Sequence, residues 1–150
     1  MKRLLFIGAG WEQKELIIQA KSLGFEIFAT HPYIDKSVMS LCDRYFIRDS
    51  DDIDAHLKLA QTFNVNSVIT DNCDYSLYTA TFISEKLGFP SVGLNSASCA
   101  MLKSEQRKRC KNALHVNQPE FYIFKTLDVF KTISSKFTYP FIVKPNDSRG

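Results

Sequence analysis

The sequence predicts an α/β protein in which a parallel sheet is covered by helices. Short apolar runs alternate with segments that repeat apolar residues at helical spacing, which is typical of strand–helix–strand units. Glycines follow several of these segments, where an element must end. The 150-residue chain is 45% hydrophobic and 23% charged, which is a globular composition.

The first two thirds of the chain carry this alternation most clearly. We expect strands at residues 3–8, 25–30, 44–48, 65–70 and 90–95. We expect helices at residues 12–23, 52–63, 74–87 and from Asn95 or Ser96 through a basic cluster that ends at Lys111, with one helical turn within 31–43. Gly24 and Gly88 stand where a left-handed residue commonly closes a helix.

The rhythm changes after about residue 113. A strand is expected at 118–125, a helix at 127–137 and another strand at 139–145. This piece has too few residues to bury a core of its own. We therefore expect a first domain over 1–95, a linking helix over 96–113, and an incomplete second domain over 114–150.

Charge and cysteine usage exclude several function classes. The net charge of +3 gives no global basic field, so we expect neither nucleic acid nor membrane as a partner. The basic cluster is predicted to be a solvated helix face. Neither the four cysteines nor the three histidines show metal-ligand spacing, so no metal or redox site is expected. The N-terminal apolar run is too short for a signal peptide, which predicts a cytoplasmic protein.

A glycine-bearing turn, GAGWEQ, follows the first expected strand. A dinucleotide fingerprint would place a third glycine where Gln13 stands, and an acid near Thr30, so NAD or FAD binding is disfavoured. Gly8 and Gly10 leave two interpretations open. The turn exposes backbone N–H groups to a substrate carboxylate or phosphate, or its tight geometry simply requires glycine.

Asp74 also has two interpretations. It follows an expected parallel strand, and ligands bind beyond the carboxyl ends of such strands, so Asp74 is a candidate substrate contact. It also stands where a helix N-cap is needed.

Two lysines form the strongest candidate site. Lys144 ends an apolar run and is followed by a proline and a polar, glycine-bearing turn, in which Ser148, Arg149 and Gly150 offer donors to a phosphate. Lys103 precedes a helix. The alternative for Lys144 is a surface cation at the end of a strand.

These segments together resemble a known family. The motifs are GAG, AKSLGFEIF, VITDNCD, EKLGFP, LKSEQRKR and YPFIVKPNDSRG, and they span essentially the whole chain. Their order is similar to that of the ATP-grasp superfamily, especially its carbamoyl-phosphate-synthase-like and biotin-carboxylase-like members. The resemblance implies a Rossmann-like preATP-grasp domain followed by the start of an α+β ATP-grasp domain, interrupted in its phosphate loop.

The resemblance also implies roles for these residues. Lys144 would bind the α- and β-phosphates of ATP, Lys103 would lie near the adenine or the α-phosphate, and a loop from Asn146 through Gly150 would close over the phosphates. Leu102 replaces the acid that commonly precedes the first lysine.

The implied function is an ATP-dependent ligase that joins a small carboxylate to an amine, or to another nucleophile, through an acyl phosphate. ATP and Mg²⁺ are the implied cofactors, with the metal ligands outside this chain. No side chain is predicted to act as a catalytic nucleophile, and the 150 residues alone are expected to be inactive. A homodimer is left open. The alternative is a non-catalytic Rossmann-like module that binds a small anion or a nucleotide.

Overall fold

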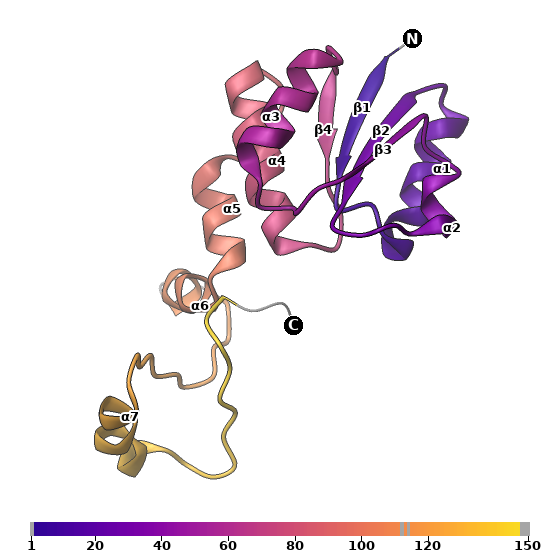
Figure 1. The fold of residues 1–150 in the computed structure, drawn as a ribbon. Coiled ribbons are helices and arrows are strands. Elements are labelled where there is room, and N and C mark those ends of the chain that lie inside the picture. Colours follow the sequence, from indigo (N-terminus) through magenta and orange to yellow (C-terminus); the bar gives the residue numbers. More distant parts are fainter. Residues whose placement is uncertain (1, 112, 114, 148–150) are drawn as a thin grey trace. The chain divides into compact units, whose positions relative to one another are not determined.

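The computed structural model describes residues 2–111, 113 and 115–147. It divides into two compact units, Met1–Met101 and Leu102–Gly150, and each is described by itself. The first unit contains a four-stranded parallel sheet in the order β3-β2-β1-β4 (Figure 1). The strands are β1 (Arg3–Ile7), β2 (Glu26–His31), β3 (Arg44–Ile47) and β4 (Ser67–Ile69). The predicted α/β class and Rossmann-like parallel sheet are confirmed.

Helices cover both faces of this sheet. They are α1 (Lys14–Ser22), which follows a 3-10 turn η1 (Trp11–Gln13), α2 (Lys36–Met39), α3 (Ile53–Thr62) and α4 (Asp74–Leu87). A further helix, α5 (Leu94–Met101), packs against α4. Figure 1 shows α1 and α2 on one side of the strands and α3 and α4 on the other. A sheet covered on both faces requires strands that are apolar throughout, and the central strand β1 is buried from Leu4 to Ile7.

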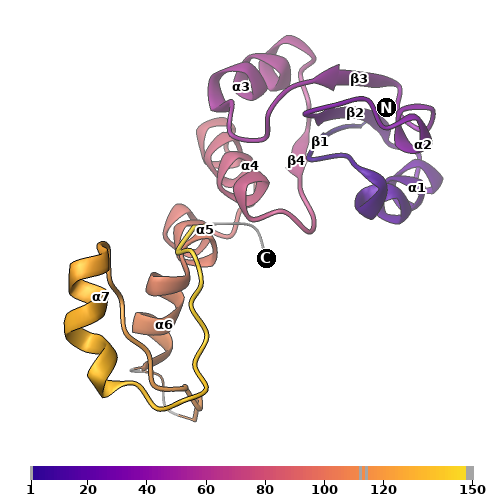
Figure 2. The ribbon, with the colours of Figure 1, turned by 60° about the horizontal axis from the view of Figure 1, so that its bottom comes forward.

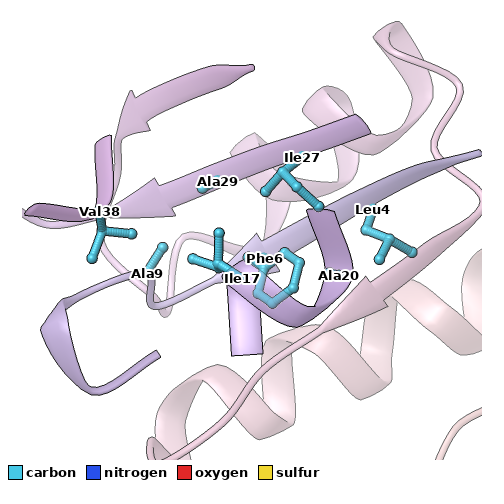
Figure 3. Close-up of a cluster of buried hydrophobic side chains, with 8 residues drawn as sticks. All are labelled: Leu4, Phe6, Ala9, Ile17, Ala20, Ile27, Ala29 and Val38. Atoms are coloured by element: carbon cyan, nitrogen blue, oxygen red, sulfur yellow. The ribbon is translucent and has the colours of Figure 1, made fainter. Parts of the chain in front are cut away.

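The side chains of β1 alternate between two apolar clusters. Leu4 and Phe6 contribute to the cluster that Figure 3 shows, which is completed by Ala9, Ile17, Ala20, Ile27, Ala29 and Val38. Leu5 and Ile7 contribute to a second cluster, together with Phe28, Ala60, Val65, Val68, Ala80 and Ile83. Successive strand residues point to opposite faces, so one short strand anchors both layers of the core.

The helix ends agree with the sequence signals. Asp52 caps α3, because its side chain accepts a hydrogen bond from the Ala55 amide at 3.1 Å. Gly24 follows α1 with φ of 82°, and Gly88 closes α4 with φ of 72°. Both glycines are therefore left-handed, as predicted.

The helix expected from residue 95 to Lys111 is two helices. α5 ends at Met101 and α6 (Lys103–Lys111) begins after Leu102. In one continuous helix, the Lys103 amide would bond back to the carbonyl four residues earlier. Here it donates instead to the Asn146 carbonyl at 3.0 Å. A contact with a distant segment has replaced the local one, which sequence periodicity could not reveal.

The second unit contains α6, α7 (Leu127–Ile133) and a short 3-10 turn η2 (Ser134–Lys136), which together agree with the helix expected at 127–137. Figure 2 shows long stretches without helix or strand before and after α7. The strands expected at 118–125 and 139–145 are absent from the described part of this unit, as is the strand expected at 90–95 from the first unit. A strand needs a hydrogen-bonded partner, and these apolar segments pair with none there.

Aromatic rings hold the second unit together. Phe130 and Phe137 lie with ring centroids 5.7 Å apart, and Phe141 lies 4.9 Å from Phe137. Phe124 adds a fourth ring, 5.1 Å from Phe130. All four side chains are only partly buried, and Ile142 and Val143 beside them are exposed. The described residues of this unit thus form a small ring cluster rather than a closed core.

A buried histidine joins α3 to the sheet of the first unit. His56 is fully buried, its Nδ1 lies 2.6 Å from the Asp52 carbonyl oxygen, and its Nε2 lies 2.8 Å from Thr30 Oγ1. A carbonyl oxygen only accepts, so Nδ1 carries the proton and Nε2 of the neutral ring accepts from the Thr30 hydroxyl. Burial lowers the pKa of His56 below its ordinary value of 6.5, although the neighbouring acids Asp52 and Asp51 oppose this shift.

We expect stability to fall on mild acidification because of His56. Its pKa is lower in the folded protein than in the unfolded chain, so the unfolded state binds the proton first as pH falls. The contribution is complete above pH ~6.5 and is lost progressively below it. Urea unfolding at pH 8 and pH 5.5 should show a smaller loss for His56→Gln than for the wild type. Equal losses for both proteins would contradict this assignment.

Candidate functional site

Asn146 joins the segments that carry the two predicted ATP-binding lysines. Its backbone carbonyl accepts from the Lys103 amide at 3.0 Å, and its Oδ1 accepts from the Ser104 amide at 2.8 Å. Lys144 lies two residues before Asn146, so its Cα lies within ~7 Å of that of Asn146. The second unit therefore brings together Lys103 and Lys144, which are 41 positions apart in the chain.

The surroundings of this junction are basic and open to solvent. Lys144 is exposed, and Lys103 is partly buried at the start of α6. Farther along α6, Lys108 pairs with Glu105 at 2.7 Å, and Arg107 donates to Gln118 Oε1 at 2.8 Å. Two residues of the predicted basic cluster, Arg107 and Lys108, thus make surface contacts within the unit. The two lysines lie on the adjoining segments of this junction, and their binding of an anion such as a phosphate stays a prediction.

The remaining predicted loop residues, Ser148, Arg149 and Gly150, lie outside the residues that the structure describes. Their phosphate-binding role stays a prediction.

In the glycine turn of the first unit, three backbone amides donate to partners within the protein. The Gly8 and Ala9 amides both donate to the Thr30 carbonyl, at 3.0 and 2.8 Å. The Gly10 amide donates to Gln13 Oε1 at 2.8 Å. Each of these amides already has a partner inside the protein. These three amides are therefore not free in this conformation, and binding of a substrate carboxylate or phosphate at the turn stays a prediction.

Close packing explains why this turn contains glycine. Gly8 has φ of 83°, and a Cβ added there would lie 2.7 Å from Ser76 Oγ on α4. A Cβ added at Gly10 would lie 2.9 Å from His31 Cε1 at the end of β2. Both contacts are shorter than a Cβ tolerates, so the interpretation as a tight turn that requires glycine is the one with structural support.

Gln13 fastens this turn to the end of β4. Its side chain is buried, and it accepts from Gly10 through Oε1 and donates through Nε2 to the Asp71 carbonyl at 2.7 Å. The sequence comparison with a dinucleotide fingerprint treated Gln13 only as a missing glycine. The structure shows that it connects two loops at the carboxyl edge of the sheet, a role that a buried amide can fill and glycine cannot.

Asp74 is not the N-cap of α4. The cap is Cys73, and Asp74 is the exposed first residue of the helix, where a carboxylate is favoured by the helix dipole. The cap interpretation is therefore wrong, and a substrate contact stays a prediction.

Two buried hydroxyls near this edge were not singled out from the sequence. Among the described residues, neither Ser76 Oγ on α4 nor Thr70 Oγ1 after β4 has a hydrogen-bond partner. Ser76 is fully buried against the Gly8 turn, and no sequence signal distinguishes it from other helix serines.

The described residues hold no group of three or more His, Cys, Asp or Glu side chains that could bind a metal ion. A search of the same residues finds no helix long and apolar enough to cross a membrane.

Two curated proteins that are similar to this chain share one description. No protein-family model matches the chain. It is 25% identical over 145 residues to a formate-dependent phosphoribosylglycinamide formyltransferase from Prochlorococcus marinus, covering 96% of this chain and 37% of the relative. It is 26% identical over 144 residues to the protein of the same description from Wolinella succinogenes, covering 95% and 37%. The chain thus spans little more than a third of the curated relatives it matches.

Solved structures share the fold. An L-amino acid ligase from Bacillus licheniformis matches with a TM-score of 0.80 and 20% identity, over 99% of this chain and 38% of that one. An N5-carboxyaminoimidazole synthetase from Staphylococcus aureus, solved with ADP, matches with a TM-score of 0.75 and 19% identity, over 98% and 39%. A phosphoribosylglycinamide synthetase from Anaerococcus prevotii matches with a TM-score of 0.73 and 24% identity, over 93% and 35%.

Proposed function

We propose that this chain, which has the N-terminal architecture of the ATP-grasp superfamily, is the N-terminal part of an ATP-dependent ligase. The ligase would join a carboxylate to an amine, or to another nucleophile, through an acyl phosphate. The resemblance seen in the sequence and the similarity to known proteins both support the superfamily.

The observation that carries the proposal is the junction at Asn146. Transfer of the γ-phosphoryl group depends mainly on positioning and on neutralising phosphate charge. Two cationic side chains on adjoining segments suit that task better than a single one. The hydrogen bonds from the Lys103 and Ser104 amides to Asn146 keep the start of α6 beside the segment that bears Lys144.

In the proposed reaction, a carboxylate oxygen attacks the γ-phosphorus of ATP and the bond to the β-phosphate oxygen breaks. ADP leaves, and an acyl phosphate remains. An amine then attacks the acyl carbon, inorganic phosphate leaves, and the amine loses a proton. Lys144 and Lys103 would hold the ATP phosphates during the first step, since lysine acts on phosphate as a point charge.

Magnesium, when bound with ATP, would supply further charge neutralisation at the phosphates. The described residues offer no cluster of ligands for it, so we assign none of them to a metal.

The relatives indicate which carboxylate to try first. Formate is the co-substrate in the names of the curated relatives, and a 2-oxoglutarate carboxylase domain with a similar fold was solved with bicarbonate. L-Amino acids follow from the ligase with the highest TM-score among those described above. We propose that the enzyme is cytoplasmic and that two copies of it form a homodimer.

The test is ADP formation in a single turnover, with the full-length protein in excess over ATP and with Mg²⁺, when formate, bicarbonate or L-amino acids are added in turn. The proposal requires that one carboxylate raise ADP formation at least ~10-fold over the rate with ATP alone, which corresponds to ~1.4 kcal/mol of barrier. ATP binding with no carboxylate-dependent ADP formation would favour the alternative, a non-catalytic nucleotide-binding module.

A further inference from the structure

We propose that Asn146 is a positioning residue of the nucleotide site, because it fixes the start of α6, and with it Lys103, against the segment of Lys144. This inference rests on the proposed function. It concerns a residue that was noticed in the sequence only as the first position of a polar loop.

The geometry is that of a helix cap supplied from a distant segment. The first amides of a helix have no partner within it, and α6 begins with Lys103 and Ser104. Asn146 satisfies both, through its own carbonyl and through its side chain, at 3.0 and 2.8 Å. An ordinary cap comes from the residue directly before the helix, whereas Asn146 lies 42 positions after Ser104.

This arrangement links the two lysines in a way that a local cap could not. The Asn146 side chain bonds to α6, and the Asn146 backbone continues directly from Lys144 through Pro145. Pro145 has a fixed φ, so few backbone rotations separate Lys144 from the bonded Asn146. Release of Asn146 would let the two segments move independently, and the cations would have to be ordered again each time ATP binds.

Variants at Asn146 separate positioning from simple capping. Asn146→Ala removes the side-chain bond and should raise the Kd for MgATP about five- to tenfold in the full-length protein, an effect of the size of a lost cap. Asn146→Asp keeps a good capping oxygen but adds a negative charge. We expect this variant to unfold at the wild-type urea midpoint and yet to bind MgATP about tenfold more weakly, because the charge lies close to the phosphates.

The matched control is Thr126→Ala. Thr126 caps α7 in the same unit, where its hydroxyl accepts from the Val129 amide at 3.3 Å, and neither predicted ATP-binding lysine lies on α7. This variant should lose stability without weakening MgATP binding.

Each of four outcomes would overturn the proposal. Wild-type MgATP affinity in Asn146→Ala, which loses the side-chain bond to Ser104, would leave Asn146 with a capping role alone, and equal weakening by Thr126→Ala would make the effect general. Wild-type affinity in Lys144→Ala would refute the proposed nucleotide site itself, and the positioning role with it. Loss of binding in Lys144→Ala together with unchanged binding in both Asn146 variants would refute only the positioning role.

Discussion

Lys144→Ala should weaken binding of MgATP about 30- to 150-fold. A hydrogen bond between a charged donor and a phosphate contributes about 2–3 kcal/mol when it is lost without replacement. Lys144 is exposed, so its removal should leave the fold unchanged and the urea midpoint within error of the wild type. Isothermal titration of the full-length protein with MgATP measures the effect directly.

Lys131→Ala is the control for Lys144. Lys131 is exposed near the end of α7 in the same unit and carries the same charge. Its loss should change MgATP affinity less than twofold, since surface charges at a distance are screened by salt.

The same titration with NADH should show no binding for the wild type. Tight NADH binding that Lys144→Ala leaves intact would contradict the assignment and favour a dinucleotide enzyme.

Gly8→Ala should be the most damaging small substitution in the first unit. The backbone there has φ of 83°, and the added Cβ would meet Ser76 Oγ at 2.7 Å inside a fully buried contact. Left-handed strain costs about 1–2 kcal/mol, and overpacking at a rigid site adds about 1–3 kcal/mol. We expect the free energy of unfolding to fall by about 3–4 kcal/mol, measured by urea denaturation.

Gly24→Ala separates the two causes. Gly24 has nearly the same φ, 82°, but an added Cβ there meets nothing within 4 Å. This variant should lose only the backbone contribution of about 1–2 kcal/mol. If both variants lost the same free energy, the contact between the glycine turn and Ser76 would have no energetic weight, and the account of the turn as a packing requirement would be wrong.

The sequence predicted most of the first unit because its elements carry local patterns of apolar residues. β1 is a short continuous apolar run and α1 repeats apolar residues at helical spacing, and Gly24 and Gly88 mark helix ends that local conformation dictates. The parallel sheet follows from this alternation, since a helix between strands returns the chain to the same edge. In such a unit, local and tertiary preferences agree.

Features set by distant contacts could not be predicted. The break at Leu102 depends on Asn146, and the role of Gln13 depends on the Asp71 carbonyl, 58 positions away. The strands expected at 118–125 and 139–145 have suitable composition, but a strand forms only with a partner. The two lysines could be proposed from the sequence because each stands beside a recognisable local pattern, and their binding of ATP stays a prediction. Their junction at Asn146 could not be predicted, because residue spacing in the sequence does not indicate its hydrogen bonds.

Isotope scrambling tests the central claim most directly. ATP labelled with ¹⁸O in the bridge between its β- and γ-phosphates is incubated with the full-length protein, Mg²⁺ and formate, with bicarbonate and L-amino acids in parallel, and without any amine. Reversible formation of an acyl phosphate produces ADP that stays in the site. The β-phosphate of this bound ADP can rotate before ATP forms again. We predict that label moves to the non-bridging β-oxygens only when one of these carboxylates is present. Bound ATP that keeps its label with every carboxylate would contradict the assignment of this chain to a ligase.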